Sequence, residues 1–179
     1  INEFQDDEKV LELCYTIFGK TEKDGIFNEK WDSILTRIIN FCKNPNINSR
    51  TFTKEEPLSI IAFLPTGNID KLQIALQNLI TKHSVLPEFE IVCLCGKING
   101  GVEAVERIND AMTSTKLKKK KGLLILTGTM CSLGVSLPHC DIALMLNNSE
   151  GGDQYLQMMY RCMTEAKGKK CGFVVDLNL

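Results

Sequence analysis

Five apolar stretches of strand length, separated by longer polar or amphipathic stretches, constrain the fold of this chain more than any other feature. They are 58-LSIIAFL-64, 90-EIVCLCG-96, 122-GLLILTG-128, 141-DIALMLN-147 and 171-CGFVVDLN-178. Near-continuous apolar strands are typical of a parallel sheet that is buried on both faces. Crossovers between such strands are right-handed. The pattern therefore predicts an α/β fold with a doubly wound parallel sheet and helices on both faces.

Helical periodicity occupies the intervals between the predicted strands. Apolar residues recur every three or four positions over 72–80 and over Val102–Met112, and a further helix is predicted over Gln154–Met163. Open parallel sheets bind their ligands where the strands end. We therefore expect the functional residues in the turns that follow the strands, at 65–68, 96–101, 127–136 and 147–153.

The first fifty residues follow a different pattern. Two amphipathic helices are predicted there, joined by the polar turn 19-GKTEKDG-25, and residues 43–50 have the composition of a linker. The GKT within the turn is not a phosphate loop, because the upstream glycine is missing and a helical pattern precedes it. We predict a helical segment and linker over 1–50, followed by an α/β domain over 51–179.

Composition matters here for what it excludes. The chain has 179 residues with 21 Lys and Arg against 22 Asp and Glu, a net charge of −1, so overall basicity gives no reason to expect nucleic-acid binding. No apolar run approaches the ~20 residues of a membrane span, and no basic leader opens the chain. Because the chain begins at Ile1, without an initiator Met, we expect it to be a piece of a longer protein.

Eight cysteines are many for a chain of this size. Most lie in or beside apolar stretches, which is typical of buried free thiols in a reducing compartment. The Cys-x-x-Cys pair of a zinc site is absent, and Cys93-x-Cys95 within a strand is only a weak pair of ligands. We predict no metal site.

The turn after the third strand, 127-TGTMCSLGVSLPHCD-141, is the richest in small and hydroxyl residues. Its backbone amides, together with the hydroxyls of Thr127 and Thr129, could hold a phosphate, and Gly134 permits close approach of the backbone. A tight turn without a ligand has the same composition. From composition alone, the two interpretations are equally supported.

Two other features carry charge. Arg161 lies among Met and Tyr in the helix after the fourth strand, and Gln157 precedes it by one helical turn on the same face. An Arg in such surroundings pairs with a carboxylate or binds an anion. The run 116-KLKKKK-121 has five lysines in six residues; a solvated loop is its default interpretation, and contact with a nucleic-acid backbone is the alternative.

The order of these segments resembles that of superfamily 2 helicases. The stretch 122-GLLILTGTMCSLGVSLPHCDIALMLN-147, followed by 157-QMMYRCMTEAKGKK-170, is similar to motifs V and VI of that family, and 59-SIIAFLPTG-67 resembles motif IV. The residues of the second stretch are most similar to those of helicase-like proteins of nucleocytoplasmic large DNA viruses. The resemblance covers about residues 57–178. It implies the second of two RecA-like lobes, with ATP bound in the cleft between them.

The resemblance also implies roles for individual residues. Those expected to contact the nucleic-acid backbone are Thr66, Gly67, Thr127, Gly128 and Thr129. Those expected near the nucleotide are Gly134, Ser136, Gln157 and Arg161, with Gln157 and Arg161 facing the γ-phosphate as the catalytic pair. ATP and Mg²⁺ would be held mainly by the first lobe, which supplies the phosphate loop and the metal-binding carboxylates.

Three positions depart from the family pattern. Tyr160 stands at the usual Gly of motif VI, Thr164 at its usual second Arg, and Ser136 at the usual Asp of motif V. Either Arg161 acts as the only arginine finger, or this lobe supports hydrolysis poorly.

The sequence therefore predicts the second lobe of an ATP-dependent nucleic-acid helicase or translocase. Its expected partners are a DNA or RNA backbone and the first RecA-like lobe of the same chain, with no membrane. The alternative is a degenerate lobe that serves as an interaction or transcription-factor module without unwinding.

Overall fold

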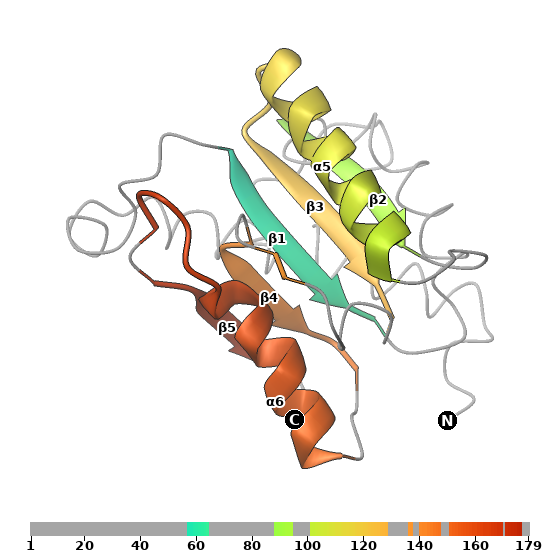
Figure 1. Ribbon diagram of the computed structural model, residues 1–179, viewed down its shortest axis with the longest axis vertical. Coiled ribbons are helices and arrows are strands. Elements are labelled where there is room, and N and C mark those ends of the chain that lie inside the picture. The colour runs from blue at the N-terminus through green and yellow to red at the C-terminus, as the bar shows by residue number, and fades with distance from the viewer. Residues whose placement is uncertain are drawn as a thin grey trace, which may run out of the picture.

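A five-stranded parallel sheet forms the centre of the molecule (Figure 1). The structure, a computed structural model, describes residues 57–64, 88–94, 101–128, 136–137, 140–147, 151–169 and 171–176. The sheet has the strand order β2-β3-β1-β4-β5. Its strands are β1 (Leu58–Phe63), β2 (Phe89–Leu94), β3 (Gly122–Thr127), β4 (Ile142–Met145) and β5 (Phe173–Asp176).

The register aligns the ends of the strands. In the centre, Phe63 of β1 lies between Thr127 of β3 and Met145 of β4. All four strand pairs are parallel, so the carboxyl ends of the strands meet at one edge, the carboxyl edge, and their starts meet at the other, the amino edge. The predicted parallel α/β sheet is confirmed, and each strand falls on a predicted apolar stretch.

Two helices cover one face of the sheet (Figure 1). Helix α5 (Gly101–Leu117) connects β2 to β3, and α6 (Gly152–Met159) continues as the 3-10 turn η2 (Tyr160–Met163) between β4 and β5. Both connections step across the sheet in the same direction, so right-handed crossovers place both helices on the same face. Their inward side chains form one core with the strand residues of that face, including Ile61, Phe63, Ala104, Ile108, Met112, Ile125, Met145, Met158 and Cys162.

The opposite face of the sheet is buried as well. Ile60, Leu124 and Leu144 point to that side by strand alternation, and each is fully buried. A parallel sheet that is apolar on both faces is thus covered on both, as the continuous apolar stretches predict. The predicted helices over 1–50 and 72–80 lie outside the described residues.

The helices differ from their predicted form at three positions. Val102 is 75% exposed, because it lies two residues, or about 200°, from the buried Ala104 on the helix. Helix α5 also continues past Met112 to Leu117. Met163, the last residue of the helix predicted over Gln154–Met163, lies on the 3-10 turn η2 and is 48% exposed.

Polar contacts at the amino edge hold the strand starts together. The buried Asp141 accepts a hydrogen bond at Oδ2 from the backbone N–H of Ser59 (2.9 Å). Lys169 Nζ donates to the carbonyls of Cys140 (2.6 Å) and Thr164 (2.8 Å), which ties the segment after η2 to the start of β4.

Cysteines in the described part of the chain are free thiols: Cys93, Cys140, Cys162 and Cys171. Burial raises the pKa of the thiol of Cys162, which therefore stays protonated at neutral pH. No described helix is long and apolar enough to span a membrane.

Candidate functional site

The predicted motif V residues lie at the carboxyl edge, at the end of β3. Thr127 is the last residue of that strand and is fully buried, and Gly128 after it is also buried. The Thr127 carbonyl accepts a hydrogen bond from the backbone N–H of Leu64 (2.7 Å), whereas its hydroxyl has no hydrogen-bond partner. Leaving a buried polar group unsatisfied costs about 1–3 kcal/mol, so this hydroxyl marks a position that a ligand could satisfy.

Asn147 is a second buried polar residue at this edge, two residues after β4. Its Nδ2 lies 3.5 Å from Met158 Sδ, within reach of a weak hydrogen bond that connects the strand end to α6. Asn147 opens the turn 147–153, one of the four turns in which functional residues are expected, although the sequence assigned it no individual role. The signal was present, because an amide follows directly on the apolar run that forms the fourth strand.

Gln157 and Arg161 lie together on one flank of the helical segment formed by α6 and η2. Met158 points inward to the sheet, and Leu156 and Tyr160 point outward to solvent. Gln157 and Arg161 are four residues apart, between these two sides, and both are partly buried. Gln157 Oε1 is buried and has no hydrogen-bond partner. The flank therefore offers an amide and a guanidinium to the same ligand.

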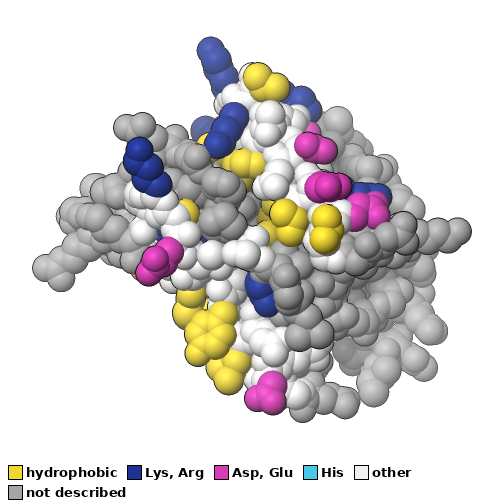
Figure 2. All heavy atoms as spheres, in the orientation of Figure 1, with side chains coloured by type: hydrophobic (Ala, Val, Ile, Leu, Met, Phe, Trp, Pro, Cys, Tyr) yellow, Lys and Arg dark blue, Asp and Glu magenta, His cyan; other side chains and the backbone are white. Residues whose placement is uncertain are grey.

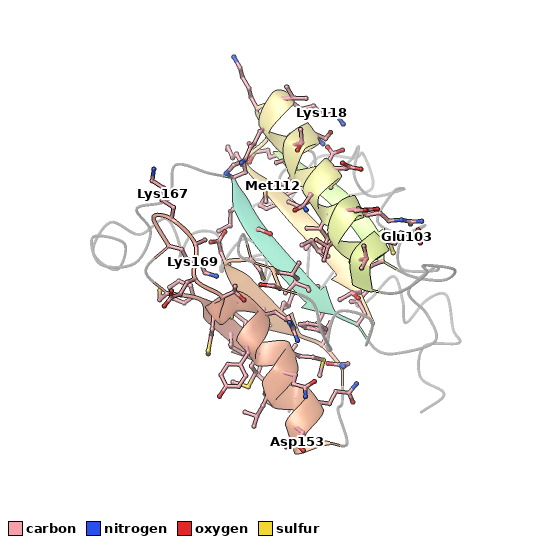
Figure 3. The ribbon with its side chains drawn as sticks, viewed as in Figure 1. Glu103, Met112, Lys118, Asp153, Lys167 and Lys169 are labelled. Atoms are coloured by element: carbon pink, nitrogen blue, oxygen red, sulfur yellow. The ribbon has the colours of Figure 1, made fainter. Side chains whose placement is uncertain are left out.

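Helix α6 begins near the carboxyl edge and runs back toward the amino edge; Asp153 of its first turn lies far from Lys167 and Lys169 in Figure 3. Arg161 is adjacent to Cys162, whose carbonyl lies close to Gly172 just before β5 begins. Thr127 and Gly128 thus lie at the end of β3, and Gln157 and Arg161 lie on the helical segment between β4 and β5.

The remaining predicted site residues divide into two groups. Ser136 is exposed, and the next residue, Leu137, is buried in the core of the helix-covered face. Thr66, Gly67, Thr129 and Gly134 lie outside the described residues, so their proximity to the two pairs stays a prediction.

A hydrogen bond fixes the other flank of α6. Tyr155 donates its hydroxyl hydrogen to Oδ2 of Asp176 at the end of β5. This hydrogen bond and the nearby carboxylate charge raise the pKa of Tyr155. Because α6 is held on this side by Tyr155 and below by Met158, the orientation of the Gln157 and Arg161 flank is fixed by packing.

The lysine run lies at the amino edge, away from Thr127 and Gly128. Lys118 and Lys120 both contact the Glu90 carboxylate, each at 2.9 Å, and Lys121 Nζ lies 2.6 Å from Glu88 Oε1. Burial raises the pKa of Glu90, but the hydrogen bonds and charges of the two lysines outweigh that effect and lower it. The run is therefore not a freely solvated loop, because three of its lysines are paired with β2 or the residue before it.

The residues present partly fit ATP and Mg²⁺, the ligands that the sequence resemblance implies. An amide and a guanidinium on one flank suit a phosphate oxygen. Gln157 Oε1 has no hydrogen-bond partner and can accept a hydrogen bond from a donor such as bound water or a ribose hydroxyl. Within the described ranges, no group of three His, Cys, Asp or Glu side chains could hold a metal ion.

No protein-family model matches the chain, and no curated protein does so either. Among solved structures, a fragment attributed to the HsdR subunit of a type I restriction enzyme from Vibrio vulnificus YJ016 is similar over 78% of this chain and 25% of its own length, with 15% identity and a TM-score of 0.43. The C-terminal part of the Fun30 ATPase domain is similar over 96% of this chain and 51% of its own length, with 15% identity and a TM-score of 0.46.

This chain therefore spans about a quarter of the first of these structures and half of the second. Likeness at this level says nothing about activity. The fold assignment rests on the sheet itself, whose five parallel strands and connecting helices are consistent with a RecA-like α/β fold.

Proposed function

We propose that this chain is the second RecA-like lobe of an ATP-dependent nucleic-acid helicase or translocase. The observation that carries the proposal is the pairing of Gln157 with Arg161 on one flank of the helix that follows β4, in the order that the motif VI resemblance requires. The buried, unsatisfied hydroxyl of Thr127 at the end of β3 supports a ligand contact at the motif V position. The similarity to viral helicases stays a prediction of the sequence.

In this proposal, the chain contributes positioning and charge. Arg161 binds the phosphates of ATP in the cleft between the lobes and stabilises the negative charge that develops during phosphoryl transfer. Gln157, one turn earlier, orients the phosphate group or the attacking water by hydrogen bonding. Mg²⁺ and the phosphate loop belong to the other lobe. Thr127 and Gly128 contact the nucleic-acid backbone.

The test uses the intact protein with both lobes. Arg161→Ala should lower the ATP turnover rate by roughly 10³–10⁵-fold, the range known for arginine fingers, with a much smaller change in nucleotide affinity. Arg161→Lys should restore little, because Lys lacks the planar fork of donors. Thr164→Ala is the control and should be mild. A folded Arg161→Ala variant with full turnover would contradict the proposed role.

A second candidate is an interaction module without hydrolysis. Leu156, Tyr160 and Met163 form an exposed apolar strip along the outer side of α6 and η2, and such strips often mark contacts with other proteins. Tyr160 also replaces the motif VI glycine. Under this candidate, Tyr160→Ser would weaken assembly of the intact protein with its partner, whereas Arg161→Ala would leave both assembly and any turnover unchanged.

A further inference from the structure

Lysines gather at the amino edge of the sheet, opposite to Thr127 and Gly128. We propose that this edge is a second nucleic-acid contact, which holds the phosphate backbone separately from the carboxyl edge. The identification of the polyanion as nucleic acid rests on the proposed function. The surface itself is defined by two segments, residues 116–121 before β3 and residues 164–169 before β5, together with the strand starts beside them.

Charge is unevenly distributed over the molecule. Dark-blue side chains gather along the upper rim in Figure 2, whereas acidic side chains lie over α5. Counted over the residues that the structure describes, the amino edge carries seven lysines against four carboxylates, a charge of +3, in a chain whose net charge is −1. The lysines are Lys116, Lys118, Lys119, Lys120, Lys121, Lys167 and Lys169, and the carboxylates are Glu88, Glu90, Asp141 and Glu165.

Ion pairs hold these ammonium groups in place without neutralising them. In the described part of the chain, Lys118, Lys120 and Lys121 share two carboxylates, those of Glu90 and Glu88. The side chains of Lys118 and Lys121 are still 55% and 54% exposed. A phosphate can therefore reach both ammonium groups from solvent, and their partial ordering lowers the entropy lost on binding.

The length of the amino edge between β3 and β5 suits contact with several phosphates. The starts of β3 and β5 are separated by two strands, which corresponds to about 14 Å at the usual strand spacing. One DNA strand presents roughly four phosphates over that length. The six residues of β3 put the amino edge about 17 Å from Thr127, so the two contacts are distinct. Lysines act as point charges, so contact at this edge should be independent of base sequence.

Two ion pairs of similar length and exposure, one at the amino edge and one away from it, allow a controlled test of the proposed contact. Lys121 pairs with Glu88 at the amino edge, and Arg107 pairs with Glu103 on the outer side of α5, at 2.6 and 2.7 Å with similar exposure. The binding of the 179-residue chain to a fluorescent DNA duplex of mixed sequence is measured as a function of salt. Lys121→Gln should reduce the slope of log K against log salt by about 0.9, and Arg107→Gln should leave it unchanged.

Removal of the carboxylates should have the opposite effect. Glu88→Gln raises the local positive charge and should strengthen DNA binding at low salt, whereas Glu103→Gln should not. Circular dichroism and thermal melting of each variant check that its fold is retained. Stronger binding by a Glu88→Gln variant that retains the wild-type circular dichroism and melting temperature supports the surface independently of stability.

Several outcomes would overturn the inference. Equal slopes for Lys121→Gln and Arg107→Gln would remove the amino edge as a contact. Polyglutamate that displaces DNA at equal charge concentration would point to an acidic protein partner instead. If Thr127→Val weakens DNA binding while Lys121→Gln does not, the proposed function survives and this inference fails. If the wild-type chain binds no DNA at low salt, both fail.

Discussion

At the scale of single residues, Gly172 is packed so closely that an added methyl group would clash with its neighbours. A Cβ atom built on Gly172 would lie 1.8 Å from the carbonyl oxygen of Cys162 and 2.4 Å from its carbonyl carbon. These are backbone atoms, so the clash cannot be relieved by rotating a side chain. The close approach joins η2, which carries Arg161, to the start of β5.

We therefore expect Gly172→Ala to lower the free energy of unfolding by about 3 kcal/mol, at the upper end of the usual cost of overpacking. Urea denaturation at neutral pH measures the change. Gly152→Ala is the control: a methyl group added there, in the first turn of α6, would meet nothing within 4 Å, and Ala favours helix, so this variant should be slightly more stable. Equal stability of Gly172→Ala and the wild type would contradict the packing of η2 against β5.

The carboxylates of the amino edge illustrate what a sequence does not reveal about single residues. The pairing of Glu90 with two lysines depends on the register that places β2 beside β3 and brings the end of α5 over it. No local pattern encodes that meeting, so the lysine run alone suggested only a solvated loop or a nucleic-acid contact. Its charge was visible in the sequence, but its partners were not.

At the scale of elements, the strands were predictable because each is a short apolar run. The helix ends were not. Apolar periodicity in α5 stops at Met112, yet the helix continues to Leu117 with Thr115 fully buried. Thr115 can occupy a core position because its hydroxyl donates to the carbonyl of Ala111 (2.7 Å), which satisfies its polar group within the helix. A prediction from hydrophobicity alone counts such a residue as polar and ends the helix too early.

The contact between α5 and β2 has a testable dependence on pH. Glu90 has a lowered pKa in the folded chain, so its ion pairs stabilise the fold above the ordinary value of 4.5. That contribution is lost as pH falls through the lower folded pKa. Glu90→Gln should cost about 1 kcal/mol at neutral pH, an estimate that allows for the solvent exposure of Lys118. The difference between variant and wild type should shrink as the pH falls through the lowered pKa of Glu90 and the wild-type carboxyl becomes protonated.

Unfolding by urea at neutral and acidic pH, for both proteins, measures that difference. Glu88→Gln serves as the comparison, because Glu88 is more exposed and pairs only with Lys121 in the described part of the chain. Its effect on stability should be smaller than that of Glu90→Gln at neutral pH. A cost for Glu90→Gln that is constant with pH would show that packing, and not charge, accounts for the loss.

At the scale of the whole molecule, Thr127 lies at the carboxyl edge of the sheet and the lysine run lies at the amino edge. The sequence predicts Gln157 and Arg161 on one flank, since residues four apart on a helix share a flank. The direction of α6 also follows from the predicted parallel sheet, because a helix that connects two parallel strands runs back from the carboxyl edge to the amino edge.

The activity of the chain on its own follows from what phosphoryl transfer requires. Catalysis needs a phosphate loop to hold the nucleotide and carboxylates to hold Mg²⁺. The GKT at Gly19–Thr21 lacks the upstream glycine of such a loop, and the described residues offer no group that could hold a metal ion. We therefore expect phosphate release by the purified 179-residue chain to stay at background, with or without DNA and Mg²⁺.

Two variants determine what any measured turnover would mean. If turnover is lost in Lys20→Ala, the GKT segment is a working phosphate loop and the chain is a complete ATPase, which contradicts the two-lobe proposal. If turnover persists unchanged in both Lys20→Ala and Arg161→Ala, it comes from a contaminating enzyme. Turnover that appears only after the first lobe is added, and falls with Arg161→Ala, is the result that the two-lobe proposal requires, because the guanidinium then acts on a nucleotide held by the other lobe.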